Sequence, residues 1–338
     1  MNKIKSITEI YDIAYENETM MSIMIELTSL CNWSCEHCYV SESSKDRYTY
    51  NQLRSLFESL REKGVNEIVF IGGEIFIRND IMKIISLARE MFFNVVLETN
   101  ISLLNESIIQ KLSELYVTEV SCTMFSLNEK VHNEITNTEG SLTKVLNNLN
   151  LLKKYGIFTS VKTPLMKKNK YDFRLIRQFC NENGFKFNVK PDLFPKRNGD
   201  ALEELIISDE SLQEMITEFD EINKHSFEEG KNLEAYPCLN TRISLFLDYK
   251  GEAFPCINYR QSIGNIYLNT LDEIWNHPKR HEIANLKYRD LEGCLKCNKI
   301  DLCVLCPGVA HMETGSIYEC AIGSRKMAKS RLSHEKIF

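Results

Sequence analysis

Long apolar runs are missing from this 338-residue sequence: none approaches the roughly 18 residues that a membrane-spanning helix needs. Residues 1–19 are too polar to supply the apolar segment of a secretory signal peptide. Excess positive charge is missing too, since the formal net charge is −6, whereas nucleic-acid-binding proteins normally carry a basic surface. We therefore expect a cytoplasmic protein whose partners include neither nucleic acid nor a membrane.

Cysteine is abundant by contrast, and its twelve residues are unevenly placed. Three lie within residues 31–38 and seven between 238 and 320, whereas Cys122 and Cys180 stand alone. In a reducing compartment, clustered cysteines indicate metal binding or catalysis rather than disulfides. We expect the two isolated cysteines to be buried and inert, because a free thiol packs as a small hydrophobic group.

A strand-then-helix rhythm runs from residue 23 to about residue 190. The predicted strands are Ile23–Thr28, Glu67–Ile71, Asn94–Thr99, Val117–Thr123, Ile157–Thr163 and Phe185–Lys190. Amphipathic helical patterns separate them; the first follows a capping box of Thr49 and Gln52. Strands that alternate with helices imply parallel pairing, in either a flavodoxin-like open sheet or a partial barrel.

The carboxyl ends of these strands favour the barrel. Polar and glycine residues gather at all of them: the cysteine loop, Gly72-Gly73-Glu74, Thr99-Asn100, Thr123, Lys162-Thr163 and Lys190-Pro191-Asp192. Barrel enzymes build their active sites from such strand ends, whereas an open sheet concentrates its site at one crossover point. We predict an α/β fold with a partial (β/α)6 TIM-like barrel over residues 20–200, after an N-terminal extension of residues 1–19.

The rhythm changes after the barrel. Residues 201–235 are predicted to form a helical bridge, with a helix that begins after Ser208. Residues 236–338 are predicted to form a second, cysteine-rich domain. Its predicted elements are two short strands, Ile243–Asp248 and Ala253–Pro255, and a helix at Leu271–Trp275.

The first cysteine cluster follows the first predicted strand. Cys31, Cys35 and Cys38 have the spacing C-x3-C-x2-C. Because a closed [4Fe–4S] cluster takes four cysteines, three would leave one iron open to a substrate or cofactor. A zinc site with His37 as the fourth ligand is the alternative. The second C-x2-C pair of common zinc sites is missing at the usual distance.

At these residues the sequence resembles the radical S-adenosylmethionine (SAM) enzymes. Glu26 through Tyr39 is similar to the family's hallmark loop, in which the open iron chelates the amino and carboxylate groups of SAM. Gly72-Gly73-Glu74 is similar to the motif that contacts the methionine amino group. Glycine lets the backbone approach closely, and a carboxylate can accept a hydrogen bond from an ammonium group. Ile75 stands where the family usually has proline.

The resemblance implies further SAM contacts at strand ends. Thr99-Asn100 is similar to the family's Thr-Asn pair, and Thr123 aligns with a serine that contacts the ribose. Thr136 stands where relatives often have an arginine. The implied SAM-binding residues are Tyr39, Gly72, Gly73, Glu74, Thr99, Asn100 and Thr123. For Thr99, Asn100 and Thr123, ordinary strand-end hydrogen bonding is the alternative.

The second cysteine cluster comprises Cys238, Cys256, Cys294, Cys297, Cys303, Cys306 and Cys320. Two of its C-x2-C pairs are only five residues apart, too close for a standard zinc ribbon. The pattern resembles the SPASM domain of peptide- and sulfatase-modifying radical SAM enzymes, although the last internal gap is two residues here and three in the family. Ile263-Gly264-Asn265-Ile266 and Cys306-Pro307-Gly308 add to the resemblance.

By that resemblance, Cys294, Cys297, Cys303 and Cys320 would hold one auxiliary cluster. Cys238, Cys256 and Cys306 would hold another, whose fourth position is open or filled by a non-cysteine group or by substrate. The implied cofactors are SAM and three [4Fe–4S] clusters, one for radical generation and two auxiliary. A single structural zinc among the seven thiols is the alternative.

The resemblance implies an enzyme, a radical SAM oxidoreductase. It would cleave SAM reductively to a 5′-deoxyadenosyl radical that abstracts hydrogen from substrate. We favour maturation of a ribosomally made peptide, by a thioether or carbon–carbon cross-link or by epimerisation. Formylglycine formation is an alternative, although sulfatase maturases usually carry aspartate where Ile257 follows Cys256. The sequence also permits a haem-precursor or small-molecule enzyme, and a non-enzymatic iron–sulfur or zinc scaffold.

The expected partners are a precursor peptide and a flavodoxin- or ferredoxin-type electron donor. About twenty residues precede the first strand, too few for a leader-binding domain, so we expect leader recognition to use a separate protein or another surface. The sequence identifies no catalytic acid or base. Tyr39, Glu98, Lys162, Lys190 and Asp192 all lie at or near strand ends, where each could equally be a structural or solvated group.

Overall fold

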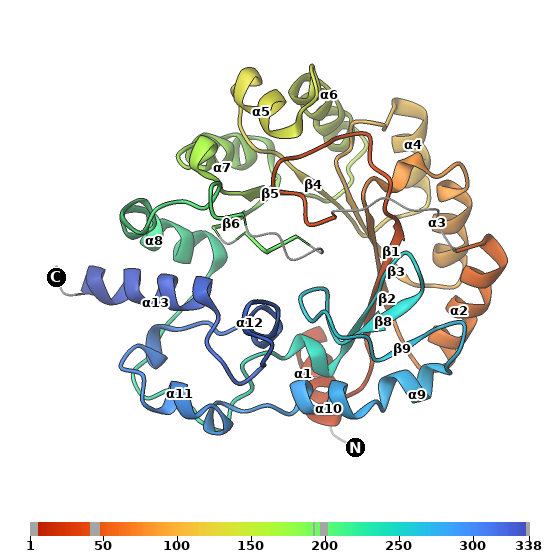
Figure 1. Cartoon of the computed structure of the whole chain (residues 1–338). Coiled ribbons are helices and arrows are strands. Elements are labelled where there is room, and N and C mark those ends of the chain that lie inside the picture. Colours follow the sequence, from red (N-terminus) through yellow and green to blue (C-terminus); the bar gives the residue numbers. More distant parts are fainter. Residues whose placement is uncertain (1–5, 41–47, 192, 197–201, 336–338) are drawn as a thin grey trace.

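Six parallel strands and the helices that follow them form the larger part of the molecule (Figure 1). This arrangement confirms the predicted α/β fold with a partial barrel. The computed structural model describes residues 6–40, 48–191, 193–196 and 202–335. The strands are β1 (Ser22–Thr28), β2 (Glu67–Gly72), β3 (Asn94–Thr99), β4 (Glu119–Thr123), β5 (Thr159–Pro164) and β6 (Lys186–Lys190). They lie side by side in chain order, so all their carboxyl ends meet at one edge of the sheet.

Helices cover the outer face of this half-barrel (Figure 1). They are α2 (Tyr50–Glu62), α3 (Ile81–Glu90), α4 (Glu106–Glu114), α5 (Glu129–Thr136), α6 (Ser141–Lys154) and α7 (Asp172–Asn183). The predicted capping box of Thr49 and Gln52 is confirmed at the start of α2. Helix α5 is absent from the sequence prediction because its buried residues are mostly polar, which leaves no apolar periodicity to detect.

The sheet does not stop at the half-barrel. Strand β7 (Ser244–Leu247) pairs in parallel with β1, and β8 (Glu252–Phe254) and β9 (Gly264–Asn265) follow antiparallel. Strand β1 is therefore central, which explains why its apolar side chains Ile23, Ile25 and Leu27 are fully buried. One continuous sheet thus joins the cysteine-rich segment to the strand that leads into the first cysteine loop.

The remaining helices are α8 (Asp209–Asn223), α9 (Leu271–Trp275), α10 (Pro278–Ala284), α11 (Glu292–Leu295), α12 (Pro307–Thr314) and α13 (Ile322–Glu335). Helix α8 begins after Ser208, as predicted, and buries its apolar face. Helix α13 returns to pack along α8, where the Arg331 guanidinium donates to both carboxylate oxygens of Asp220 at 2.8 Å. No helix in the described part of the chain is long and apolar enough to cross a membrane.

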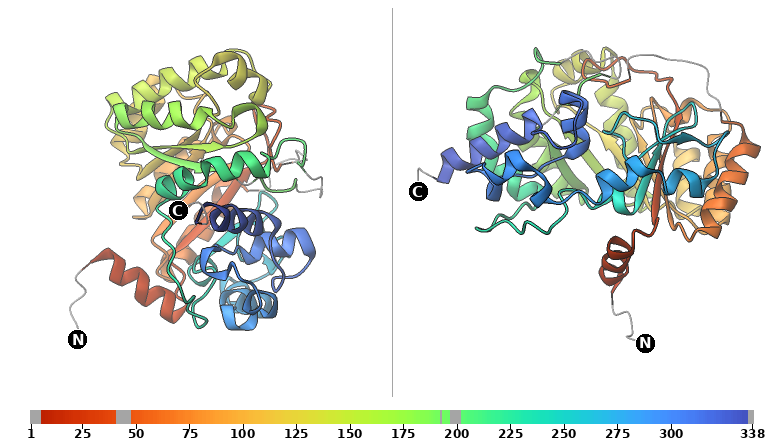
Figure 2. Two further views of the ribbon diagram at one scale, coloured as in Figure 1. Left: turned by 90° about the vertical axis from the view of Figure 1, so that its left-hand side faces the viewer. Right: turned by 60° about the horizontal axis from the view of Figure 1, so that its bottom comes forward.

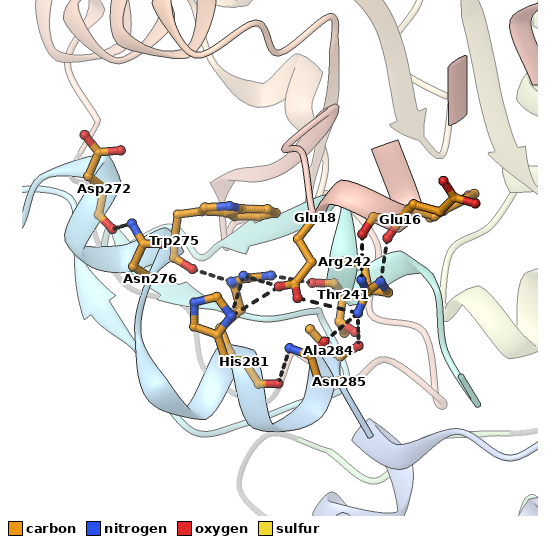
Figure 3. A network of polar contacts seen from close by, with 12 residues as sticks. Glu16, Glu18, Thr241, Arg242, Asp272, Trp275, Asn276, His281, Ala284 and Asn285 are labelled. Atoms are coloured by element: carbon orange, nitrogen blue, oxygen red, sulfur yellow. Dashed lines mark hydrogen bonds and ion pairs between the residues drawn. The ribbon is translucent and has the colours of Figure 1, made fainter. Parts of the chain in front are cut away.

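The N-terminal extension contains a helix, α1 (Ile7–Asn17), which projects from the edge of the sheet opposite the cysteine loop (Figure 2). Directly after it, Glu18 accepts from the Arg280 guanidinium at 2.8 Å and lies 3.5 Å from that of Arg242 (Figure 3). Arg280 is fully buried, 3.9 Å from the centroid of the Trp275 ring. These contacts fasten the first and the last thirds of the chain together.

Candidate active site

The first cysteine loop leaves β1 and is held by the end of α5. The backbone N–H groups of Ser34 and Glu36 donate to the carbonyls of Thr136 and Ile135, at 3.2 and 3.0 Å. The Asn137 side chain donates to the Ser34 carbonyl at 2.7 Å. Thr136 therefore supports the loop through its backbone, at the position where an arginine is usual.

The three thiols of this loop lie close together. The pKa of Cys31 is raised chiefly by burial, and further by the negative charges of Glu74 and Cys38. The pKa of Cys35 is raised by burial and by the charges of Cys38 and Cys31. In the described residues, no three His, Cys, Asp or Glu side chains converge closely enough to hold a single metal ion.

His37, the alternative zinc ligand, packs its ring edge-on against Phe125, with 5.1 Å between the ring centroids. Its Nδ1 atom is buried and has no hydrogen-bond partner among the described residues. Burial lowers the pKa of His37 to about 4, so the ring is neutral at physiological pH. His37 is thus a neutral ring of the loop itself that packs against Phe125.

Gly72 and Gly73 lie directly against the loop. A Cβ atom at Gly72 would lie 2.5 Å from the Thr28 carbonyl oxygen, and one at Gly73 would lie 2.2 Å from that of Leu30. Backbone N–H groups join the two segments, from Gly73 to Thr28 at 2.9 Å and from Glu74 to Leu30 at 2.8 Å. The expected close approach is present, and it joins the Gly-Gly-Glu segment to the chain that enters Cys31.

The Glu74 carboxylate is fully buried and accepts three sets of hydrogen bonds. Its donors are the backbone N–H of Phe76 at 2.9 Å, the Thr99 hydroxyl at 2.8 Å and the backbone N–H of Asn100 at 2.7 Å. Burial raises the pKa of Glu74 even though these donors oppose the shift. Thr99 and Asn100 therefore orient Glu74, a role that neither of the two predictions for them specified.

Two residues of the site were missed from the sequence, Asn32 and Ser102. Both hydrogen-bond to the Asn100 side chain, from the cysteine loop and from the turn after β3 respectively. Short polar side chains in turns have no periodicity, so only their closeness to Cys31 and to the Thr-Asn pair could have indicated them.

The remaining predicted residues lie around the barrel mouth. Thr123, at the end of β4, is half-buried and pairs with Lys162 in the sheet register. Lys162 in turn forms an ion pair with Glu98 across the strand ends. The Tyr39 hydroxyl donates to the buried Glu26 carboxylate at 3.3 Å. Lys190 ends β6 and lines a cavity beside Cys306, and Asp192 lies outside the described residues.

The seven later cysteines separate into two groups in space. Cys294, Cys297, Cys303 and Cys320 line one cavity of about 610 Å³. Burial is the main cause that raises the pKa of Cys303 to about 11, and the nearby charges of Cys320 and Cys294 add to it. A cavity with four thiols on its walls fits a fully ligated auxiliary cluster.

Cys238, Cys256 and Cys306 form the other group. Burial is the main cause that raises the pKa of Cys256 to about 12, and the nearby charges of Cys238 and Cys306 add to it. Gly308 permits the close packing, since a Cβ there would lie 3.1 Å from the Cys256 sulfur. The Asn258 amide lies 3.9 Å from the Cys306 sulfur. That these three thiols hold one cluster and the other four hold a second stays a prediction from the resemblance.

A hollow of about 770 Å³ lies between the barrel and the cysteine-rich segment. Its walls come from Lys167 after β5, from the segment before α8, from Arg260, and from α12 and α13. A second cavity of about 240 Å³ shares part of this lining and reaches Cys306. Arg260, one of the lining residues, also lies over the Tyr39 ring that follows the first cysteine loop, 5.6 Å from the ring centroid.

Two stretches of the chain match models of known protein families. Residues 25–180 match the model of the radical SAM superfamily, and residues 238–298 match that of the SPASM iron–sulfur cluster-binding domain. The chain belongs to the radical SAM superfamily. Its SPASM domain lies at the C-terminal end, and Cys303, Cys306 and Cys320 follow the matched stretch.

Two known proteins are similar to most of this radical SAM enzyme. The subtilosin biosynthesis protein AlbA of Bacillus subtilis is 26% identical over 290 residues, which are 80% of this chain and 63% of AlbA. The AdoMet-dependent heme synthase of Nitratidesulfovibrio vulgaris is 20% identical over 349 residues, 93% of this chain and 95% of the synthase. The chain thus spans less than two thirds of AlbA and nearly all of that heme synthase.

Solved structures share the fold of this radical SAM enzyme. Streptococcus suis SuiB bound to S-adenosylmethionine superposes with a TM-score of 0.68 at 16% identity, over 94% of this chain and 83% of SuiB. The enzyme anSMEcpe with bound AdoMet and the Kp18Cys peptide gives a TM-score of 0.69 at 20% identity, over 93% of this chain and 97% of anSMEcpe.

SAM and iron–sulfur clusters are the cofactors of this family, and the residues present fit them. Cys31, Cys35 and Cys38 would hold the first cluster, with Gly73 and Glu74 at the side where SAM would bind. When bound, SAM and a reduced cluster supply hydrogen-atom abstraction chemistry. The protein's part is to hold the carboxylate of Glu74 in one orientation, keep the thiols together and exclude water.

Proposed function

We propose that this radical SAM enzyme modifies a ribosomally made peptide, by forming a thioether or carbon–carbon cross-link or by epimerising a residue. The observation that carries the proposal is the hollow of about 770 Å³ between the barrel and the SPASM segment. It shares part of its lining with the smaller cavity that reaches Cys306, and its Arg260 lies over the Tyr39 ring that follows the first cysteine loop. A peptide can occupy such a hollow and present one residue at the barrel mouth.

The lining of the hollow also supports a peptide. Leu193, Ile207 and Ile322 provide apolar contacts, whereas Arg260 and Lys167 provide cations. Binding sites for flexible ligands combine apolar walls with a few polar groups that fix orientation. The similarity to AlbA, a bacteriocin biosynthesis protein, agrees with a peptide substrate.

The cofactor set that we propose is SAM, one radical-generating [4Fe–4S] cluster and two auxiliary clusters. The twelve cysteines are all free thiols in the described structure, which suits the reducing cytoplasm. An electron donor of the flavodoxin or ferredoxin type would reduce the first cluster. A separate protein or another surface would recognise the leader of the precursor.

A direct test uses a short peptide encoded beside the gene for this chain. The reconstituted enzyme, reductant and SAM are incubated with that peptide, and the product is examined by mass spectrometry. Loss of two hydrogen atoms indicates a cross-link, whereas unchanged mass with deuterium uptake from heavy water indicates epimerisation. SAM cleavage that leaves every such peptide unaltered would refute the peptide proposal.

A haem-type small-molecule substrate is the second candidate, because a heme synthase matches this chain almost end to end. The same incubation with an iron porphyrin precursor in place of the peptide separates the two. Porphyrin turnover without peptide modification would favour this second function.

A further inference from the structure

A closed ring of three side chains fastens the end of β3 to the cysteine loop. The Asn100 amide nitrogen donates to the Asn32 amide oxygen at 2.9 Å. The Asn32 amide nitrogen donates to the Ser102 hydroxyl at 2.9 Å, and that hydroxyl donates to the Asn100 amide oxygen at 2.7 Å. Asn100 and Ser102 are both 8% exposed, so water competes little for these bonds.

The orientation of the Asn100 amide is fixed by the backbone. The N–H of Ser102 donates to Asn100 Oδ1 at 2.9 Å, and only the oxygen side of an amide can accept. The Nδ2 side must therefore face the loop, where it lies 3.8 Å from the Cys31 sulfur. One of its two hydrogens serves Asn32 and the other serves Cys31, beside the Trp33 backbone N–H at 3.4 Å.

Backbone strain supports this turn as a built feature. Ile101, between Asn100 and Ser102, has φ = 54°, which is rare for a β-branched residue. Its buried backbone is held from both sides, by the Thr99 hydroxyl at 2.9 Å and by the Asn148 amide at 2.7 Å. Strain of this kind persists only where surrounding contacts impose it, and it gathers at functional sites.

Asn100 also contacts the other half of the site. Its backbone N–H donates to Glu74 Oε2 at 2.7 Å, while its side chain reaches Cys31. One residue thus links the carboxylate expected to bind SAM with a thiol expected to bind the cluster.

We propose that Asn100 is a positioning residue that sets the reduction potential of the cluster held by Cys31, through its Nδ2–H···Sγ hydrogen bond. Hydrogen bonds to the sulfur ligands are among the factors that tune iron–sulfur potentials. A donor beside a thiolate favours the more negative, reduced state, so its loss should make the cluster harder to reduce. The inference rests on the proposed radical-generating cluster and is independent of the substrate.

The chain offers a matched pair of variants for the test. Asn100→Ala removes the amide at Cys31, and Asn258→Ala removes the similar amide 3.9 Å from the Cys306 sulfur. Each full-length protein is reconstituted anaerobically and titrated with reductant while electron paramagnetic resonance is recorded. The spectrum that changes on addition of SAM marks the cluster with the open iron.

We expect Asn100→Ala to lower the equilibrium constant for reduction of the SAM-responsive cluster about tenfold, or about 59 mV for one electron. Asn258→Ala should leave that potential unchanged and alter only a signal that ignores SAM. Ser102→Ala keeps the Asn100 amide and the backbone N–H that orients it, but removes the hydroxyl that closes the ring with Asn32. It should therefore give a smaller shift in the same direction as Asn100→Ala. If Asn100→Ala does not hold its clusters, the potential measured in Ser102→Ala serves as the test instead.

An unchanged potential of the SAM-responsive cluster in Asn100→Ala, or in Ser102→Ala where the former fails to assemble, overturns the inference. Equal shifts in Asn100→Ala and Asn258→Ala also overturn it, because they would indicate a general loosening. If no wild-type signal responds to SAM, the proposed radical-generating cluster itself fails. The two failures are thereby distinguishable.

Discussion

Gly73 has no room for any side chain. A Cβ atom added at Gly73 would lie 2.2 Å from the Leu30 carbonyl oxygen, which is far too close. Leu30 directly precedes Cys31, so this contact lies at the start of the cysteine loop. We expect Gly73→Ala to displace the cysteine loop and to lower the iron bound by the first cluster and the rate of SAM cleavage at least tenfold. Iron analysis and a 5′-deoxyadenosine assay measure both effects.

Gly64→Ala is the control for this variant. Gly64 has φ = 83° at the end of α2, and no described atom lies within 4 Å of an added Cβ. The left-handed conformation alone should cost about 1–2 kcal/mol of stability. Iron content and SAM cleavage should be unaffected. Equal losses in both glycine variants would show that stability, rather than the loop contact, controls cluster binding.

Glu74→Gln tests the carboxylate that the turn after β3 orients. The Glu74 carboxylate uses both of its oxygens to accept from the Thr99 hydroxyl and two backbone N–H groups. In glutamine one of these oxygens becomes an NH2 group, which cannot accept a hydrogen bond. Loss of a charged hydrogen bond costs about 1.5–3 kcal/mol, so SAM binding should weaken by about ten- to a hundredfold while the iron content stays constant. Equilibrium dialysis with labelled SAM measures this. Unchanged SAM affinity would contradict the assigned role of Glu74.

Among single residues, the sequence could indicate only those that belong to a motif with a characteristic spacing. The cysteine spacing and Gly72-Gly73-Glu74 have one, and both occupy the expected edge of the sheet. Asn32 and Ser102 have none, because their importance comes from hydrogen bonds between segments 70 residues apart.

Among the elements, α8 and α13 depend on one buried ion pair. The Arg331 side chain is 5% exposed and that of Asp220 is 16% exposed, and the guanidinium also donates to the Leu302 carbonyl at 2.8 Å. We expect Asp220→Asn to destabilise the fold by about 3 kcal/mol, because it leaves a buried cation unpaired. Urea unfolding at pH 7 measures the loss.

The pH dependence of this loss follows from the pKa of Asp220. Burial raises it, but hydrogen bonds from His225 and Arg331 outweigh burial and lower it overall. The stabilisation is therefore present above the ordinary aspartate pKa of about 3.9 and disappears as pH falls through the lower folded value. The difference between wild type and Asp220→Asn should shrink below about pH 4.

Asp209→Asn is the matched control for this pair. Asp209 joins the same two helices through Lys326 at 3.6 Å and Lys329 at 3.5 Å, but its side chain is 44% exposed. An exposed pair contributes at most about 1 kcal/mol, so this variant should unfold almost as wild type does. A loss as large as that of Asp220→Asn would refute the role assigned to the buried pair.

Periodicity predicted the strands and long helices of the barrel because each buries one apolar stripe. It missed α5, whose buried face includes His132, Asn133 and Thr136. It also could not show that β7 pairs with β1, because that contact joins residues about 220 positions apart and no local pattern encodes it.

For the whole molecule, we expect three clusters, or about twelve iron atoms per chain. Cys303→Ala should remove about four of them and leave the first cluster able to cleave SAM, since Cys303 lies in the separate cavity of about 610 Å³. Iron and sulfide analysis measure the loss. A wild-type content of about four iron atoms, or stoichiometric zinc, would contradict the auxiliary assignment.

The arrangement as a whole places the SPASM segment beside the barrel through the continuous sheet and the contacts of Arg280 and Arg331. Sequence motifs predicted both parts. Their joining by Glu18 near the start of the chain could not be predicted, since single charged residues in a polar segment resemble any solvated surface.

The central claim, that Cys31, Cys35 and Cys38 hold a radical-generating cluster, has one direct measurement. The anaerobically reconstituted, reduced protein is mixed with SAM, and 5′-deoxyadenosine is quantified in wild type and in Cys35→Ala. We predict 5′-deoxyadenosine from wild type and none from Cys35→Ala, which should retain the iron of its auxiliary clusters. Absence of 5′-deoxyadenosine from wild type with its clusters intact would contradict the claim.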